Sequence, residues 1–325
     1  MTFPCDFYGA AFAGAGAVSG LTLPLWRRWC LRTNLVDDPG HRKIHTTPVP
    51  LAGGFAVLTG LLLPLAVGAI LLKLGVVRLA SAGLIVHGVD RRAEELLVLA
   101  LGAVGITWLG WLDDRQELKA LPKFLGQLVI AVAVAAASKR ITLFIPSALF
   151  SYTVTVIWVL TVINAFNFMD NMNGLCAGVG AIGALLFAGL AASRGEYLVA
   201  ITGFLMAGAL AGFLPWNFPR GRVFLGDAGS HLVGYLLAVM AILPHFYTKL
   251  YPQRLAVLAP LFVLAVPLLD LAQVTVFRTW HRKPFWIGDT NHLSHRLTRA
   301  GFSRTRAVLC LWLAAAVIGA LAFSL

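Results

Sequence analysis

The sequence Y-T-V-T-V-I-W-V-L-T-V-I-N-A-F-N-F-M-D-N-M-N-G-L, from Tyr152 to Leu175, joins an apolar run to a polar cluster. The run from Tyr152 to Ile163 is typical of the last part of a membrane-spanning helix. Four polar side chains then follow at intervals of three, namely Asn164, Asn167, Asp170 and Asn173. Because each such step turns an α-helix by about 60°, the first three share one sector of the helix. Such groups are costly against lipid, which favours either a substrate site or, more plainly, helix caps and contacts with neighbouring helices.

The composition is that of a polytopic membrane protein. Of the 325 residues, 59% are hydrophobic and only 12% are charged, and the mean hydropathy is +0.81. Soluble domains carry about 25% charged residues. Ten apolar segments have spanning or near-spanning length: 8–26, 52–72, 94–112, 124–143, 147–163, 174–193, 197–214, 229–244, 255–277 and 307–324. No internal repeat or long linker separates them. We therefore predict an all-α polytopic integral membrane protein of about ten transmembrane helices, with one domain over residues 1–325.

The basic residues predict an orientation in the membrane. The loops after the odd-numbered segments hold 17 of the 26 Lys and Arg residues, and the loops after the even-numbered segments hold 9. The positive-inside rule then places the odd loops in the cytoplasm and both termini outside. The first 26 residues lack Lys and Arg, so we expect a retained helix rather than a cleaved signal peptide. The net charge of +12 fits anionic headgroups and substrates, whereas no basic run interleaved with aromatics indicates nucleic-acid binding.

The polar clusters of the sequence lie in the odd loops, which predicts an active site at the cytoplasmic face of the membrane. The first of these loops runs from Val36 to Gly54 and contains Lys43 and His45, which offer positive charge to phosphate. A juxtamembrane basic patch is the alternative explanation for this loop.

Two adjacent carboxylates, Asp113 and Asp114, end the third apolar segment. The dipole at a helix C-terminus disfavours negative charge there, so a specific use is expected. Adjacent carboxylates favour Mg²⁺ binding or a general base close to phosphate. The alternative is a solvated helix end that Arg115 and Lys119 neutralise.

A third carboxylate, Asp227, lies in the sequence F-L-G-D-A-G-S just before the eighth segment. It suits an ordinary helix cap, and equally a metal–diphosphate site that the flanking glycines allow the backbone to approach. The last odd loop contains His292, His295 and Arg296, which are candidates for phosphate recognition. Zinc binding is disfavoured because the two histidines have no third ligand at a suitable spacing. Asp270, inside the ninth segment, is a further candidate as an intramembrane carboxylate.

Five motifs, in order along nearly the whole chain, resemble those of the polyprenyl-phosphate N-acetylhexosamine-1-phosphate transferase family, glycosyltransferase family 4. This family includes the phospho-N-acetylmuramoyl-pentapeptide translocase and the UDP-GlcNAc:undecaprenyl-phosphate enzymes. The motifs are R-K-I-H…P-V-P-L-A-G-G, L-D-D-R…L-P-K-F-L-G-Q, N-A-F-N-F-M-D-N-M-N-G-L, F-L-G-D-A-G-S and H-L-S-H-R-L-T-R-A-G-F-S. Each motif is weak alone, and the five together are specific.

The resemblance implies that an N-acetylhexosamine-1-phosphate, with GlcNAc-1-phosphate favoured, passes from a UDP-sugar to undecaprenyl (polyprenyl) phosphate. UMP would be released, and the lipid-linked diphospho-sugar would start a cell-envelope glycan such as an O-antigen or teichoic acid. It also implies Mg²⁺, with Mn²⁺ as a substitute, a multi-pass place in a bacterial inner membrane and a homodimer. Transfer of phospho-N-acetylmuramoyl-pentapeptide is the alternative. A secondary transporter is remote, because transporters place their sites near the midplane, usually between repeats.

The resemblance also carries roles to individual residues. It assigns Mg²⁺ to Asp227, with Asp113 and Asp114 as further acidic candidates for catalysis or metal binding, and Asp113 to the lipid phosphate. The expected substrate-binding residues are Lys43, His45, Lys123, Asn164, Asn167, Asp170, Asn173, His292, His295 and Arg296. Two departures from the family pattern are visible. The usual D-G-x-D-G-L has Asn173 for its second aspartate, and the usual H-x-H-H loop has Ser294 for its middle histidine.

Overall fold

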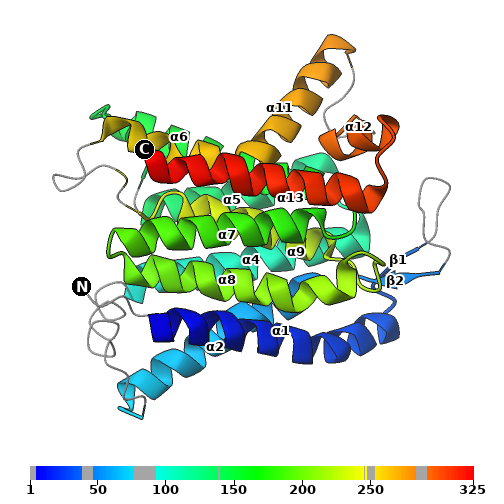
Figure 1. Ribbon diagram of the computed structural model, residues 1–325, viewed down its shortest axis with the longest axis horizontal. Helices are drawn as coiled ribbons and strands as arrows, with labels where there is room; N and C mark the ends of the chain where they lie inside the picture. The colour runs from blue at the N-terminus through cyan, green and yellow to red at the C-terminus, as the bar shows by residue number, and fades with distance from the viewer. Residues whose placement is uncertain are drawn as a thin grey trace.

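The computed structural model describes residues 5–38, 47–76, 93–137, 140–244, 246, 253–282 and 291–325. Lys43 and His45 of the predicted phosphate-binding loop lie outside the described residues. Long helices run side by side along the molecule (Figure 1). Their bounds are α1 Cys5–Arg32, α2 Gly53–Lys73, α4 Ala93–Gln116, α5 Ala120–Ala137, α6 Ala148–Met169, α7 Leu175–Ser193, α8 Tyr197–Asn217, α9 Gly226–Met240, α10 Ala259–Val263, α11 Ala265–Trp280, α12 Leu293–Arg299 and α13 Arg304–Ala320.

The predicted all-helical membrane architecture is confirmed, and each of the ten apolar segments contains a helix. Within the described residues, eight helices are long and apolar enough to cross a membrane, or nine if one bent pair counts as a single span. The eighth segment forms α9, which has only 15 residues. From Ala228 to Met240 every residue of α9 is buried, between α2, α4, α6 and α7. This short helix is therefore the centre of the bundle rather than a lipid-facing span.

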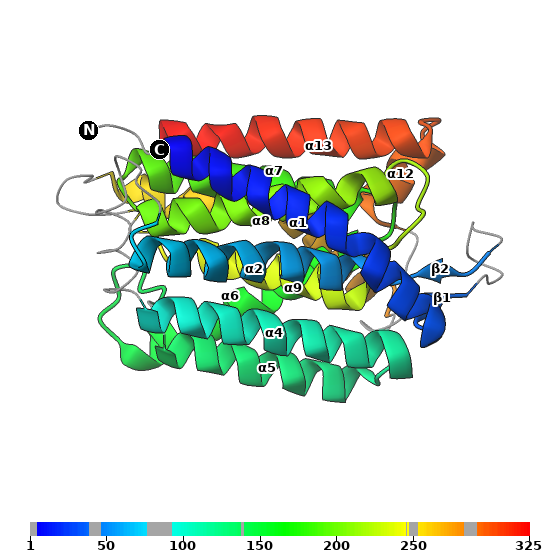
Figure 2. The same cartoon turned by 90° about the horizontal axis from the view of Figure 1, so that it is seen from below.

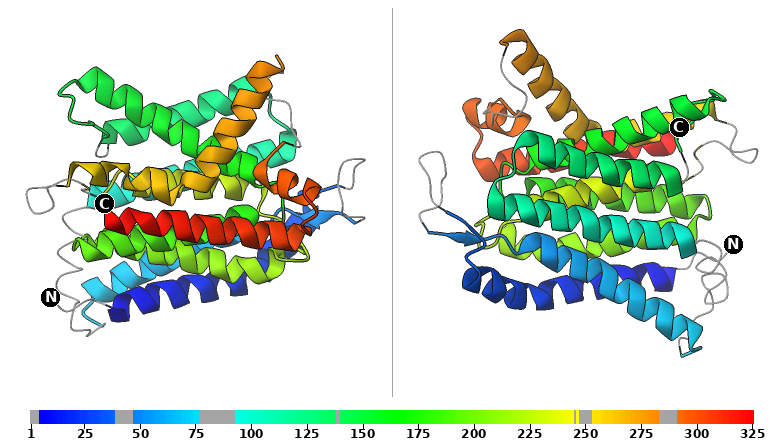
Figure 3. Two further views of the ribbon diagram at one scale, coloured as in Figure 1. Left: turned by 45° about the horizontal axis from the view of Figure 1, so that its top comes forward. Right: turned by 180° about the vertical axis from the view of Figure 1, so that it is seen from behind.

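The ninth segment, predicted over 255–277 as one apolar stretch, is broken near its middle. The 3₁₀ turn Arg254–Leu258 and α10 meet α11 at an angle of 72°. Pro267 explains the break, because a proline ring collides with the carbonyl four residues earlier, which belongs to Val263 at the end of α10. As a result α11 leaves the bundle at a steep angle, as Figure 3 shows.

The odd loops gather at one end of the bundle. Figures 1 and 2 show β1 (Val36–Asp37), β2 (Val49–Pro50) and α12 at this end, and the start of α1 and the C-terminus at the other. The two strands pair antiparallel, with Val36 opposite Pro50. Hydrogen bonds then join β2 to the loop between α8 and α9, from Phe224 N to Pro50 O and from Gly53 N to Phe224 O, each 3.0 Å. The first loop is thereby fixed beside the start of α9.

Close helix packing sets the position of that start. A Cβ atom on Gly110 of α4 would collide with the carbonyl oxygen of Asp227, so α4 approaches α9 more closely than a larger residue would allow. On the other side, a Cβ atom on Gly54 of α2 would lie 2.5 Å from the backbone nitrogen of Gly229. Glycines on two neighbouring helices thus let the first turn of α9 sit between them.

Candidate active site

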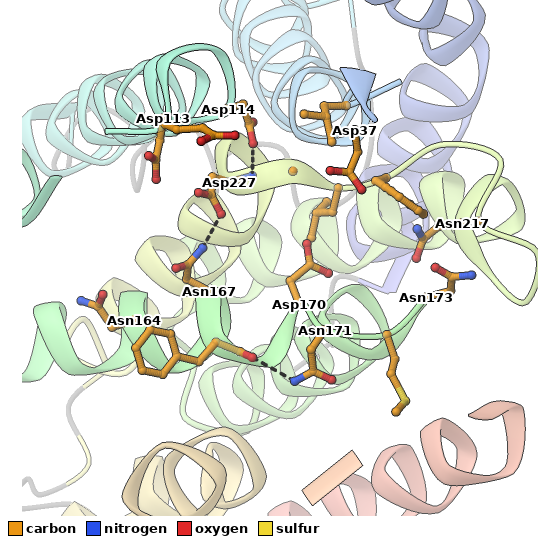
Figure 4. A pocket seen from close by; sticks show the side chains of 18 of the residues that line it. Asp37, Asp113, Asp114, Asn164, Asn167, Asp170, Asn171, Asn173, Asn217 and Asp227 are labelled. Atoms are coloured by element: carbon orange, nitrogen blue, oxygen red, sulfur yellow. Dashed lines mark hydrogen bonds between the residues drawn. The ribbon is translucent and has the colours of Figure 1, made fainter. Parts of the chain in front are cut away.

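A pocket of about 1600 Å³ opens at the end of the bundle where the odd loops meet. All five of these loops contribute to its wall. Representative lining residues, one or more from each loop, are Asp37, Asp113, Lys123, Asn167, Asp227 and Arg304. Figure 4 shows the polar side chains of α4, α6 and α9 directed into this space. The predicted convergence of motifs on one face of the molecule is therefore present in the structure.

The ammonium group of Lys123 lies between two carboxylates at the base of the pocket. Its Nζ atom is 2.5 Å from Asp113 Oδ2 and 3.1 Å from Asp227 Oδ2. The other oxygen of Asp113 accepts the backbone N–H of Leu118 at 2.9 Å, and Asp113 is only 7% exposed. Residues more than 100 positions apart therefore share one charge centre, which the sequence had suggested only as separate motifs.

Asp114 points away from this charge centre although it is adjacent to Asp113. Its Oδ1 accepts the backbone N–H of Asp227 at 2.7 Å, and its Oδ2 accepts that of Ala228 at 3.0 Å (Figure 4). Both oxygens thus satisfy free N–H groups in the first turn of α9, where a helix dipole favours negative charge. Gly226 (φ +73°) begins that helix, and a Cβ atom there would lie 2.8 Å from Asp114 Oδ2. Asp114 is placed to orient α9.

Asn167 completes the contacts of Asp227. Its Nδ2 group donates to Asp227 Oδ1 at 2.6 Å and to Ser230 Oγ at 3.1 Å, while its Oδ1 accepts from Lys123 at 3.3 Å. The last turn of α6 is therefore tied to both α5 and α9. Asn164, one turn deeper, also lines the pocket, but its amide donates to Gln127 Oε1 at 2.8 Å.

Burial and neighbouring groups act on the pKa of Asp227 in opposite directions. Burial, the largest single influence, raises this pKa, but the Lys123 ammonium and the other neighbouring groups together outweigh burial and hold the pKa of Asp227 well below its usual range. The side chain of Asp227 is nevertheless 33% exposed, toward the pocket. It is therefore an accessible carboxylate that is ionised at neutral pH.

The donor set suits a hard divalent cation that shares its shell with substrate. The described residues contain no group of three or more His, Cys, Asp or Glu side chains placed to hold a metal ion. Mg²⁺ does not require such a cage, since it commonly takes one or two carboxylates and completes its shell with water and substrate phosphates. Asp227, whose side chain is 33% exposed toward the pocket, fits this requirement best, and Asp113 would join it by exchanging its contact with Lys123 for the ion. Asp114 fits it less well, because backbone N–H groups of the first turn of α9 occupy both of its oxygens.

The opposite wall of the pocket carries Asp170, Asn173 and Asn217 (Figure 4). Asn217 joins two loops, since its Oδ1 accepts from Gly174 N at 2.5 Å and its Nδ2 donates to Val223 O at 2.9 Å. Asn173 donates to Pro219 O at 3.2 Å. Asp170 and Asn173 lie where the sequence predicted a substrate-binding wall, and their contact with substrate stays a prediction.

His292 is held by Asp270, the carboxylate that the sequence had marked inside the ninth segment. His292 Nδ1 lies 2.8 Å from Asp270 Oδ2, and Leu293 N donates to Asp270 Oδ1 at 2.6 Å. Asp270 thus fixes both the ring and the first turn of α12. His292 is 5% exposed and does not line the pocket, whereas His295 does. The predicted role of His292 in phosphate binding stays untested, and its position favours holding α12 in place.

The serine at the position of the family's middle histidine has its own partner. Ser294 Oγ donates to Asn171 Oδ1 at 2.6 Å, and Asn171 donates in turn to Phe168 O. This contact joins α12 to the loop between α6 and α7. Arg296 is exposed and lies outside the pocket lining, so its predicted phosphate contact has no support from its position. Arg304, at the start of α13, lines the pocket instead.

Burial and nearby positive charge also affect His295. Burial, followed by His292 and Arg304, lowers the pKa of His295 below its ordinary value. The imidazole that faces the pocket is thus neutral at pH 7. Arg304 and Asn217 lie at helix ends outside the quoted motifs, so the sequence does not single them out. Gln127 is the last residue of the second motif, but the sequence suggests no role for it.

Comparison with known proteins bears on this arrangement directly. Residues 96–245, which contain Asp113, Lys123, Asn167 and Asp227, match the family model described as glycosyl transferase family 4. A decaprenyl-phosphate N-acetylglucosaminephosphotransferase of Mycobacterium tuberculosis (strain H37Rv) is 34% identical over 308 residues, 87% of this chain and 73% of that protein. The chain belongs to glycosyl transferase family 4. The motifs that led to this family in the sequence are the ones that line the pocket.

Two further relatives are similar to this chain over most of their length. A phospho-N-acetylmuramoyl-pentapeptide-transferase of Desulforudis audaxviator is 32% identical over 340 aligned positions, 96% of this chain and 95% of that protein. An undecaprenyl-phosphate alpha-N-acetylglucosaminyl 1-phosphate transferase of Escherichia coli (strain K12) is 26% identical over 316, 91% of this chain and 77% of that protein. The similarity to these relatives therefore extends beyond residues 96–245 to nearly the whole chain.

Proposed function

We propose that this family 4 protein transfers GlcNAc-1-phosphate from UDP-GlcNAc to a polyprenyl phosphate, such as undecaprenyl phosphate, and releases UMP. The product is a lipid-linked diphospho-sugar that starts a cell-envelope glycan. Relatives named as polyprenyl-phosphate N-acetylglucosaminyl 1-phosphate transferases support this choice. The single observation that carries the proposal is the Lys123 ammonium between Asp113 and Asp227 at the base of a pocket large enough for a nucleotide-sugar.

The chemistry needs positive charge between two anions. An oxygen of the lipid phosphate forms a bond to the β-phosphorus of the UDP-sugar, and the bond from that phosphorus to the bridging oxygen breaks as UMP leaves. No enzyme group is bonded in this direct transfer, because the lipid phosphate is already a nucleophile. Lys123 would screen the approaching phosphates, and positioning with charge neutralisation supplies most of the catalysis in phosphoryl transfer.

A divalent cation, with Mg²⁺ preferred and Mn²⁺ as a substitute, would be held by Asp227 together with Asp113. When bound, it would neutralise charge on the diphosphate. Asp114 would act through the backbone of α9 and Asn167 through its amide on Asp227. The protein's own contribution is thus a fixed set of oxygens and one ammonium group.

We place the pocket at the cytoplasmic face of a bacterial inner membrane. The basic residues of the odd loops support this side, and all five odd loops border the pocket. Nucleotide-sugars arrive from water, and the lipid phosphate lies at the headgroup plane, so a site at the helix ends can receive both. A homodimer stays a prediction, because no described contact tests it.

Transfer of phospho-N-acetylmuramoyl-pentapeptide is the second candidate. The Desulforudis audaxviator relative favours it, since its identity of 32% extends over 95% of that protein. The sequence of the histidine loop, H-L-S-H-R, favours the GlcNAc candidate because it resembles the histidine–arginine version of that branch.

Purified protein tests the two candidates directly. UDP-GlcNAc, UDP-GalNAc and UDP-N-acetylmuramoyl-pentapeptide would each be incubated with undecaprenyl phosphate and Mg²⁺, with UMP and the lipid product measured by mass spectrometry. We expect UMP release that requires the lipid and is fastest with UDP-GlcNAc. Faster transfer from the muramoyl donor would favour the second candidate, and UMP release from none of the donors would refute both.

The direct route has a test of its own. The protein would be incubated with UDP-GlcNAc and Mg²⁺ without lipid, quenched, digested and examined by mass spectrometry. We expect Asp113 and Asp114 to stay unmodified. A phospho-sugar on either carboxylate would instead establish a two-step reaction.

A further inference from the structure

Below the Lys123 cluster, a second group of polar side chains lies inside the bundle. Gln127 and His231 are 1% and 0% exposed, and their Nε2 atoms are 3.1 Å apart. Asn164 Nδ2 donates to Gln127 Oε1 at 2.8 Å. We call Gln127, Asn164 and His231 the amide–imidazole layer. Its members come from α5, α6 and α9, the three helices that also carry Lys123, Asn167 and Asp227.

Each member of this layer lies one helical turn from a residue at the base of the pocket. We call these pocket residues, Lys123, Asn167 and Asp227, the reaction layer. Positions three or four apart share one helix face. The pairs are Lys123 with Gln127 in α5, Asn167 with Asn164 in α6, and Asp227 with His231 in α9. Figure 4 shows the α6 pair, with Asn167 directed at Asp227. The same three helices are thus joined twice, one turn apart.

The direction of each hydrogen bond in the lower layer is determined by a backbone carbonyl. Asn164 Nδ2 donates to Leu160 O, which can only accept. The same Nδ2 group donates to Gln127, so the Gln127 atom facing Asn164 is the carbonyl oxygen and the one facing His231 is the NH₂ group. An NH₂ group can only donate, hence His231 Nε2 accepts and carries no proton.

This chain of donors leaves the proton of a neutral His231 on Nδ1. That atom is buried and meets no partner at hydrogen-bond geometry among the described residues. In water the neutral ring prefers its proton on Nε2, so the contact with Gln127 selects the less common tautomer. The selection depends on Asn164, because its amide, which Leu160 O orients, donates to the Gln127 oxygen and so determines which way the Gln127 amide points.

We propose that Gln127, Asn164 and His231 are positioning residues that hold α5, α6 and α9 in the register of the reaction layer, with His231 neutral and protonated at Nδ1. A directional contact 3.1 Å long breaks when either helix slides or rotates, whereas apolar packing permits small shifts. An error of about 1 Å in a reacting group costs about a hundredfold in rate. The effect on transfer rests on the proposed function, and the protonation state of His231 does not.

Nitrogen NMR of the full-length protein tests the tautomer. The protein would be labelled with ¹⁵N-histidine and measured in lipid vesicles by magic-angle spinning, and the signal missing from His231→Gln would be assigned to His231. We expect a protonated Nδ1 and an unprotonated Nε2, unchanged between about pH 8 and about pH 6. In Asn164→Leu, which frees the Gln127 amide, we expect the Nε2-protonated form to appear. Wild-type protein with Nε2 protonated would overturn the proposal.

Kinetics test the positioning role. His231→Leu should lower kcat by about tenfold to a hundredfold and leave KM for UDP-GlcNAc nearly unchanged. His231→Gln should recover most of the rate, because a glutamine carbonyl can accept from Gln127. Gln127→Leu removes the same contact from the other helix, so it should match His231→Leu, and the double variant should lose no more than either single variant. Thermal unfolding of every variant would be measured alongside.

Several outcomes would overturn the positioning role. In the first, the loss of kcat in the double variant is the product of the two single losses. In the second, kcat falls only in proportion to the fraction of folded protein. In the third, His231→Gln is as slow as His231→Leu. If wild-type protein transfers no sugar-phosphate from any donor, the proposed function fails, and the NMR result then decides on its own whether the layer has the structure that we infer.

Discussion

The carboxylate of Asp114 accepts the backbone N–H of Asp227, with 2.7 Å between Oδ1 and N. This contact crosses from the end of α4 to the first turn of α9. Of the two adjacent acidic residues, Asp113 therefore contacts Lys123 in the charge centre, whereas Asp114 holds α9, the helix that carries the accessible carboxylate of Asp227. The contact separates roles that the D-D sequence alone does not distinguish.

Asp114→Asn should therefore destabilise the fold as well as reduce transfer. An asparagine can accept only one of the two N–H groups through its single carbonyl, so one buried donor loses its partner, at a cost of about 1–3 kcal/mol in the free energy of unfolding. Thermal unfolding in detergent would measure the loss, and Asp227→Asn is the control, with lower activity but a smaller stability change. A normal melting temperature with a raised Mg²⁺ requirement would instead make Asp114 a metal ligand.

Lys123→Met should abolish most transfer while leaving the protein folded. Removing one preorganised cation from a developing charge typically costs about 10²–10³ in kcat. The pKa of Asp227 should rise in this variant, because the ammonium group that holds it low is gone. Steady-state rates would be compared with Lys73→Met, which removes an exposed lysine that does not line the pocket. Equal rate losses in both variants would show that net charge, rather than the position of Lys123, is what matters.

Asp270→Ala should lower the local stability of α12 and leave the base of the pocket around Asp227 unchanged. His292 and the Leu293 N–H group both lose their partner, and each unsatisfied buried group costs about 1–3 kcal/mol. Hydrogen exchange measured by mass spectrometry should become faster over 291–299 and stay unchanged around Asp227. Protection of α12 equal to wild type would contradict the assigned role of Asp270. Asp270→Asn keeps one acceptor and should show a smaller effect.

Binding of UDP-GlcNAc should strengthen in mild acid through His295. The pKa of this residue is lowered, so the ring is neutral at pH 7 and gains its positive charge only below the ordinary histidine range. The diphosphate of the donor stays ionised throughout, hence affinity should increase as the pH falls below about 6.5, the ordinary histidine value. Calorimetry at several pH values would measure the change. His295→Gln should remove it, and an identical pH profile in that variant would assign the effect to another group.

The grouping of the motifs could be predicted from the sequence because helices that cross a membrane alternate their loops between two faces. Charge bias and polar clusters therefore selected the same five loops that border the pocket. Asp113, Lys123, Asn167 and Asp227, which the motifs single out, all line this pocket, and their roles in catalysis and binding stay predictions.

Contacts between distant helices could not be predicted in the same way. Asp113 and Asp114 look alike in sequence, but adjacent helical positions point about 100° apart, so only the packing of α9 against α4 decides which one meets Lys123. Asp270 and His292 are 22 positions apart, and their contact depends on the start of α12 lying beside α11, which composition does not reveal. His231 lies in an apolar segment where nothing in the pattern marks it.

The lining of the pocket extends along the chain from Val36 to Val308. A membrane protein is inserted from its N-terminus as it is synthesised, so the carboxylates and Lys123 enter the bundle well before the segment that supplies His295 and Arg304 exists. Until α12 and α13 have been synthesised, the pocket that contains the charge centre lacks one wall. Sugar-phosphate transfer can therefore begin only after nearly the whole chain has been made, and a protein truncated before α12 would be inserted in the membrane yet inactive.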